Sequence, residues 1–256
     1  MHLAQLERLV LTESSVEEDE VRNLLSHLSS LKSVHLGLVY PSQDKELGYN
    51  CCSPRPPLKK QGVLLEGLLN VRDTVKHLSI GIELCPLYWP SVWGAVERDN
   101  GTPQESFKPF KGILKQFPLL RTAELPAVML FGWTYDDAPA LSELLPPTLH
   151  KLSIRNNLYY VGEFEWETNK VAEAIQNFLP FAQSATPLLN KITIRGFDMG
   201  EEEGVEPDDS TGARSACEEL GLDINISMIQ DNLSPGLWTT HRELQEGSRR
   251  DCRNYG

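Results

Sequence analysis

The 256-residue chain contains no run of about eighteen apolar residues, so its sequence predicts no membrane-spanning helix. The first residues, MHLAQLERLVLTESS, lack a basic stretch followed by an apolar core, so no signal peptide is predicted either. Cysteine is scarce, and the five residues have spacings that suit neither a disulfide framework nor a zinc site: Cys51, Cys52, Cys85, Cys217 and Cys252. We therefore expect a protein of a reducing compartment, cytoplasmic or nuclear.

The motifs of several common enzyme classes are also missing. The sequence has no Walker loop, no dinucleotide fingerprint, no HExxH zinc motif and no GxSxG nucleophile turn. The six histidines show no spacing typical of metal ligands. We therefore expect a non-enzymatic protein with no metal and no cofactor.

The net charge of −12 is concentrated in two segments. Residues 13–20 contain five acidic residues, residues 198–209 contain seven, and neither segment contains Lys or Arg. The rest of the chain is therefore balanced in charge. Because no domain carries a basic excess, nucleic acid is not an expected partner.

One aliphatic pattern recurs along the chain: an aliphatic residue, two arbitrary residues, an aliphatic, one arbitrary residue and an aliphatic. Its copies are LERLVL from Leu6, LKSVHL from Leu31, VKHLSI from Val75, LRTAEL from Leu120, LHKLSI from Leu149, LNKITI from Leu189 and a weaker GLDINI from Gly221. The last two aliphatics alternate with an exposed position, which is strand periodicity. Such recurrence predicts an α/β fold, a leucine-rich-repeat solenoid shaped as an open horseshoe.

The repeats are irregular, since their starts lie between 25 residues (Leu6 to Leu31) and 45 residues (Val75 to Leu120) apart. The alternative is a doubly wound sheet, which also alternates strands and helices. Apolar residues at helical spacing predict helices over 16–28, 59–73, 107–117, 138–145, 169–181 and 213–220. Ser15 is the expected cap of the first helix, and its acidic residues suit a solvated helix start.

Long insertions and a tail interrupt this array. Residues 41–57 and 86–104 read as insertions, and the acidic stretch 199–211 is expected to be disordered. The domain division is therefore a degenerate solenoid over 1–233, with that insertion inside it, followed by a polar tail over 234–256.

Residues between the buried aliphatics should point out of the concave face of such a solenoid. On this basis Lys151 aligns with Lys191, and Arg155 with Arg195, on neighbouring strands. Four cations gathered in an acidic protein predict a surface for an anionic partner, although splayed side chains neutralised by Glu163 or the 198–209 segment would give only a solvated face. His35 and His77 should share this face, which leaves an enzyme site around them as an alternative.

Aromatic residues are frequent in the loops after the third, fourth and fifth strands. Tryptophan and tyrosine are common interface anchors, but long insertions also need small cores of their own. Interface and local core therefore remain equally open for the aromatic candidates Trp89, Trp93, Trp133, Tyr159, Tyr160 and Trp166.

Three segments carry a family resemblance: SFKPFKGILKQFPLLRTAELPAVMLFGW (106–133), LSELLPPTLHKLSIRNNLYY (141–160) and TPLLNKITIRGF (186–197). Together they resemble the C-terminal leucine-rich region of filamentous-fungal F-box-type proteins. The resemblance implies that the repeats hold a target protein as the substrate receptor of a cullin ubiquitin ligase. No F-box is evident in the chain, so docking to the ligase adaptor is not expected. A structural domain of a larger assembly is a further alternative.

Overall fold

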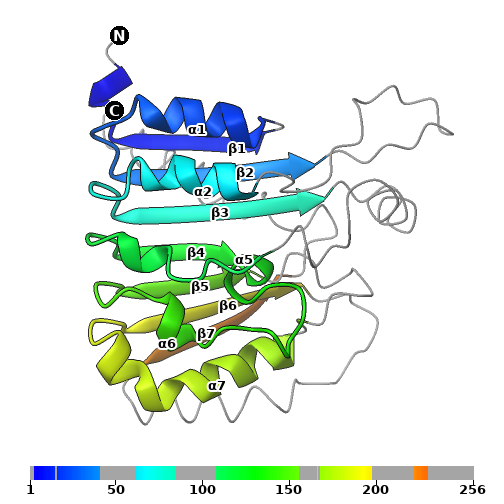
Figure 1. Cartoon of the computed structure of the whole chain (residues 1–256). Coiled ribbons are helices and arrows are strands. Elements are labelled where there is room, and N and C mark those ends of the chain that lie inside the picture. Colours follow the sequence, from blue (N-terminus) through cyan, green and yellow to red (C-terminus); the bar gives the residue numbers. More distant parts are fainter. Residues whose placement is uncertain are drawn as a thin grey trace, which may run out of the picture.

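The computed structural model describes residues 3–14, 16–40, 61–84, 108–155, 166, 168–197 and 222–229. Its centre is a seven-stranded parallel sheet whose strands follow one another in sequence order (Figure 1). The strands are β1 (Arg8–Ser14), β2 (Ser33–Tyr40), β3 (His77–Leu84), β4 (Thr122–Pro126), β5 (Lys151–Arg155), β6 (Lys191–Phe197) and β7 (Asp223–Ile229). Each of the seven aliphatic motifs thus supplies one strand, as predicted. The order excludes a doubly wound sheet, in which strand order reverses at a switch point.

The alternation of the motif decides which side chains enter the core. In β5, Leu152 and Ile154 are buried while Lys151 is exposed. The register places Leu152 beside Ala123 of β4 and Ile192 of β6, so the aliphatics form continuous buried rows across the sheet. The leading aliphatic of most motifs is buried as well, at Leu31, Val75, Leu120, Leu149 and Leu189.

One backbone hydrogen-bond pattern recurs where the chain enters each strand. The carbonyl of Glu7 accepts bonds from the amides of Lys32 (2.7 Å) and Ser33 (3.0 Å) of the next repeat. The carbonyls at the equivalent positions, Lys32, Lys76, Arg121 and His150, each accept two bonds in the same way. The recurrence holds successive repeats in the same register and satisfies backbone groups that lie outside the strands proper.

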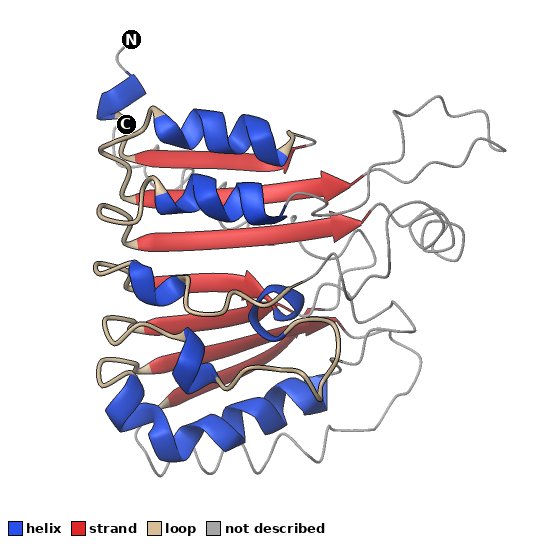
Figure 2. Cartoon of the chain, viewed as in Figure 1, coloured by secondary structure: helices blue, strands red, loops and turns tan. Residues whose placement is uncertain are grey.

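The helices lie on one side of the sheet, the near side in Figure 1, and Figure 2 separates them from the strands by colour. The described helices are α1 (Glu18–Ser26), α2 (Gln61–Leu69), α5 (Ala127–Phe131), α6 (Leu141–Leu144) and α7 (Thr168–Ala185), with 3-10 turns η1 (Leu3–Gln5) and η4 (Leu114–Gln116). Helices α1 and α2 pack so closely at Gly67 that a Cβ atom on this residue would lie only 2.8 Å from the Cα of Arg22.

Two helix predictions need correction, and one helix was missed. The helix expected over 107–117 is only the single turn η4, because Pro109 and the positive φ of Gly112 (69°) interrupt a continuous helix. The cap of α1 is Glu17, not Ser15, and the side chain of Glu20 accepts a bond from the Glu17 amide at 2.9 Å. Helix α5 was not predicted from the sequence.

The insertions at 41–57, 86–104 and 199–211, the helix expected over 213–220 and the tail at 234–256 lie outside the described residues. Within the described ranges, the model has no helix of the length and apolarity needed to cross a membrane.

Candidate functional site

The polar face of the sheet, opposite the helices, carries the side chains between the buried aliphatics. The register aligns them in rows across the strands. The row at the strand starts is Arg8, Ser33, His77, Thr122, Lys151, Lys191 and Asp223, and the next row is Val10, His35, Ser79, Glu124, Ser153 and Thr193. The predicted alignments of Lys151 with Lys191 and of Arg155 with Arg195 are confirmed.

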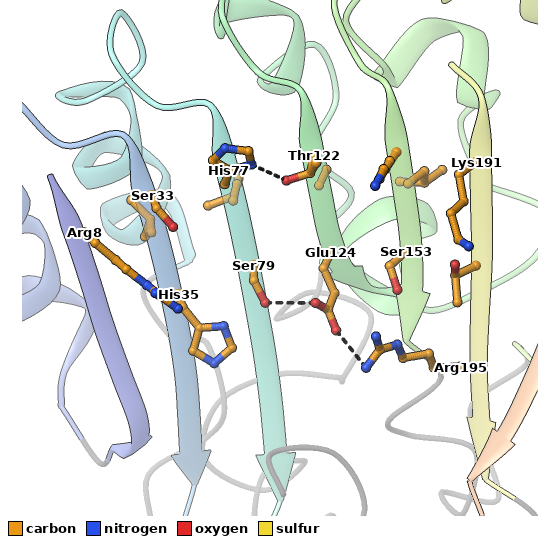
Figure 3. A pocket seen from close by; sticks show the side chains of 16 residues that line it. Arg8, Ser33, His35, His77, Ser79, Thr122, Glu124, Ser153, Lys191 and Arg195 are labelled. Atoms are coloured by element: carbon orange, nitrogen blue, oxygen red, sulfur yellow. Dashed lines mark hydrogen bonds and ion pairs between the residues drawn. The ribbon is translucent and has the colours of Figure 1, made fainter. Parts of the chain in front are cut away.

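A pocket of about 390 Å³ lies on this polar face, and residues of six strands, β1 to β6, line it (Figure 3). We call it the face pocket. Its polar lining residues are Arg8, Ser33, His35, His77, Ser79, Thr122, Glu124, Lys151, Ser153, Lys191, Thr193 and Arg195.

A carboxylate, that of Glu124, lies in the middle of the face pocket. It lies 3.7 Å from a guanidinium nitrogen of Arg195 and accepts a hydrogen bond from the hydroxyl of Ser79 at 3.4 Å (Figure 3). It also forms an ion pair with Arg155. Burial alone would raise the pKa of Glu124, but the charges of Arg155 and Arg195 outweigh it and hold the pKa below its ordinary value. The carboxylate therefore stays ionised and neutralises part of the arginine charge.

The predicted four-cation patch is divided by these contacts. The side chain of Arg155 is only 2% exposed and paired with Glu124, so the expectation that it is exposed on the face is wrong. Lys191 pairs with Asp223 at 2.8 Å. Lys151 is exposed, and no ion pair involves it within the described part of the chain. Among the described residues, Glu124 and Asp223 are acids that pair with these cations. Glu163 and the 198–209 segment, the neutralising acids considered from the sequence, lie outside the described residues.

Further cations lie where the strands begin: Lys76 and Arg121 each come one residue before a strand, and Lys151 is the first residue of β5. We call Lys76, Arg121 and Lys151 the basic rim. Backbone hydrogen bonds place Arg121 between Lys76 and His150. The amide of Arg121 donates to the carbonyl of Lys76 at 2.8 Å, and the amide of His150 donates to the carbonyl of Arg121 at 2.8 Å. Partial burial, then Arg121 and Lys76, lower the pKa of His77, whose Nδ1 lies 2.8 Å from the hydroxyl of Thr122. Sequence analysis missed Lys76 and Arg121, although the basic residues directly before four successive strands, Lys32, Lys76, Arg121 and His150, were a usable signal.

His35 is the most deeply buried polar group of the pocket. Its side chain is 6% exposed, and its Nε2 has no hydrogen-bond partner among the described residues. Burial, followed by the charge of Arg155, lowers its pKa to about 4, so the imidazole is neutral at pH 7. The hydroxyl of Ser153 is likewise buried without a partner in the described structure.

One observation favours the alternative of an enzyme site, and another argues against it. The register places Ser79 between His35 and Glu124 on neighbouring strands, so a hydroxyl, an imidazole and a carboxylate share one row. However, Ser79 bonds to Glu124, and Glu124 is engaged by two arginines. An activated serine needs a base that accepts its proton, and no Ser79–His35 bond is present in the described structure.

The described aromatic candidates belong to a local core rather than a free surface. Trp133 and Trp166 are 2% and 1% exposed, and the ring of Trp166 stacks on Phe131 with centroids 4.3 Å apart. Tyr135 lies 5.3 Å from the same ring and carries Lys170 over its own face at 4.8 Å. Neither tryptophan is available as an exposed anchor. The remaining candidates lie outside the described residues: Trp89, Trp93, Tyr159 and Tyr160.

No group of three or more His, Cys, Asp or Glu residues arranged to hold a metal ion occurs in the described ranges. A scan against protein-family models and searches of curated proteins and of solved structures found no match.

Proposed function

We propose that this chain is a non-enzymatic protein-recognition module, a degenerate leucine-rich-repeat solenoid that binds its target through the polar face of the sheet. The observation that carries the proposal is a parallel sheet in strict sequence order, with helices on one side and a polar row on the other. Stacked repeats of this kind present extended binding surfaces. Target recognition of the F-box type, within a cullin ubiquitin ligase, is proposed on the sequence resemblance alone.

The dimensions of the polar face favour a polypeptide over a small molecule. Six neighbouring strands contribute to the face pocket, and adjacent strands lie about 4.8 Å apart, so the lined surface extends over about 24 Å. A compact metabolite would contact only a few of these strands. An extended peptide or a loop of a partner would cross all of them.

Site-specific photocrosslinking tests the proposal. A benzophenone amino acid at Ser79 or Thr193 places the reactive group on the polar face, whereas Glu66 of α2 and Asn177 of α7 provide exposed control positions on helices. We expect one target protein to be crosslinked from both face positions and from neither helix position. Crosslinking confined to the helix positions would contradict the proposal.

A hydrolytic function is the second candidate, and the row of His35, Ser79 and Glu124 is the observation that favours it. A fluorophosphonate probe reacts with an activated serine but not with an ordinary one. We expect no labelling that depends on Ser79. Labelling of the wild-type chain that is lost in Ser79→Ala would favour the enzyme.

A further inference from the structure

We propose that the face pocket and the basic rim receive an acidic peptide segment of the partner, with carboxylates as the recognised groups. This inference rests on the proposed function and specifies the chemistry of the partner.

The first support is the charge of the pocket. Four lining residues are cationic, Arg8, Lys151, Lys191 and Arg195, and one, Glu124, is anionic, so the lining carries a net charge of +3. The whole chain carries −12. A cationic hollow in an acidic protein attracts an anionic group locally and orients the approaching partner.

The second support is the pair of unsatisfied polar groups inside the pocket. The Nε2 of His35 and the hydroxyl of Ser153 are buried, and neither has a hydrogen-bond partner among the described residues. A buried polar group without a partner costs about 1–3 kcal/mol, and a ligand that supplies the missing bond recovers this energy. Because Ser153 lies next to Glu124 in the register, its hydroxyl borders the arginine-held carboxylate. Peptide carbonyl and carboxylate oxygens can accept from a serine hydroxyl and from a neutral imidazole N–H.

The third support is the basic rim. Lys76, Arg121 and Lys151 form no ion pair within the described part of the chain, and the neighbouring repeats bring them to one edge of the polar face. Their backbones follow the strand spacing of about 4.8 Å. Carboxylates distributed along a peptide can therefore meet several rim cations at once.

Glu124 shows that this face already binds a carboxylate, because two arginines and the hydroxyl of Ser79 surround its oxygens. The same negative charge disfavours a dense polyanion such as a nucleic acid. Phe, Tyr and Trp are also absent from the residues that line the pocket, so it offers no platform for base stacking. The observations thus favour an acidic peptide over an oligonucleotide.

Fluorescence anisotropy of the full chain tests the inference with defined probes. The probes are a fluorescein-labelled (Glu-Gly)5 peptide, the matched (Gln-Gly)5 peptide and a dT10 oligonucleotide. We expect the glutamate peptide to bind more tightly than the glutamine peptide by about tenfold or more at low salt, and this preference to shrink as salt is added. Equal binding of both peptides, or tighter binding of dT10, would overturn the inference.

Charge reversals locate the bound peptide. Lys151→Glu and Arg121→Glu should each weaken binding of (Glu-Gly)5 by about three- to tenfold, since each replaces an attraction by a repulsion at the rim. Lys115→Glu makes the same change in net charge on the exposed turn η4, away from the pocket lining, and should change the affinity less than twofold. Equal losses in all three variants would mean that only the net charge of the chain matters, and the site would be rejected.

The crosslinking experiment separates this inference from the proposed function. If Ser79 and Thr193 positions capture a partner but the acidic peptide does not bind, the face binds protein by other chemistry and only the further inference fails. If the acidic peptide binds at the rim and the captured partner is crosslinked only from the helices, the proposed function fails.

Discussion

Strands β5 and β6 carry the same pattern, a lysine at the start and an arginine four residues later, yet their two ends have different environments. Toward the C-terminal ends of the strands, Arg155 is buried against Glu124, and Arg195 lies near the same carboxylate. At the N-terminal ends of the strands, Lys151 is exposed and Lys191 pairs with Asp223, whose side chain is 64% exposed. The identical pairs thus become an internal charge cluster at one end and a solvent-accessible edge at the other.

The difference arises from the flanking strands rather than from β5 and β6 themselves. Strand β4 contributes an acidic residue only to the middle row, and β7 contributes one only to the first row. A cation is therefore available to a partner only where the neighbouring strand leaves it unneutralised. Counting positive charges on two strands overestimates the binding surface, because charges on the adjacent strands decide which cations remain accessible.

The largest effect is expected from a pair of variants that tests whether Lys151 and Leu152 lie on opposite faces of the sheet. The comparison of the two strand ends depends on this register. Leu152→Ala removes a fully buried side chain and should lower the free energy of unfolding by about 2–5 kcal/mol. Lys151→Ala, one residue earlier and exposed, should cost less than about 0.5 kcal/mol. Thermal or denaturant melts of both variants measure this difference. Equal shifts would show that the register is wrong, since a one-residue slip exchanges the faces.

The next effect tests whether the arginine end is an internal cluster. Glu124→Gln removes the carboxylate that pairs with the buried guanidinium of Arg155, which should cost about 3 kcal/mol. The double variant Glu124→Gln/Arg155→Met also removes the buried guanidinium and should recover part of this loss. A double-mutant cycle by denaturant unfolding measures the coupling. If Glu124→Gln alone is neutral, the two ends of the strands do not differ energetically.

Much of the fold could be predicted from the sequence because the aliphatic spacing directly encodes burial and strand position. The motif at Leu149 predicts buried Leu152 and Ile154, and both are buried. Helix boundaries were less predictable, since short elements depend on local chain geometry. The positive φ of Gly112 interrupts the helix that the apolar pattern favoured, and α5 formed from an apolar run after Pro126 that lacks a helical stripe.

Less of the site could be predicted, because pairing across strands depends on side-chain reach. The alignment of Arg155 with Arg195 followed from the motif, whereas the diagonal contact from Glu124 to Arg155 did not. The local core around Trp166 was equally hard to predict, since its partner Phe131 belongs to α5, which precedes β5 in the sequence, whereas Trp166 follows β5. The residue spacing of the motif determines which side chains share a row, but contacts between rows depend on side-chain length and conformation.

The pH dependence of stability tests whether His35 is a buried neutral imidazole near the cluster of Glu124 and Arg155. Burial and Arg155 hold its folded pKa at about 4, below its ordinary value of 6.5, while Glu124 raises it and Arg8 lowers it. The unfolded chain therefore binds more protons between these values, so stability is complete above about pH 6.5 and falls as the pH drops toward 4. We expect the wild type to lose on the order of 2 kcal/mol more than His35→Gln over this window. Parallel slopes of the two unfolding curves would contradict a buried neutral imidazole.

The smallest expected effect on stability concerns the exposed end and gives the sharpest contrast with Glu124. Asp223→Asn removes a surface pair with Lys191 and should cost at most about 0.5 kcal/mol, with the difference vanishing at high salt. The same change leaves the lysine of the face pocket without its counter-charge, so binding of the (Glu-Gly)5 peptide should tighten by about two- to threefold. Anisotropy titrations and melts on one preparation measure both quantities. A variant that is strongly destabilised, or that binds the peptide more weakly, would show that Asp223 has a structural role and that the two ends of β5 and β6 are more alike than their exposure indicates.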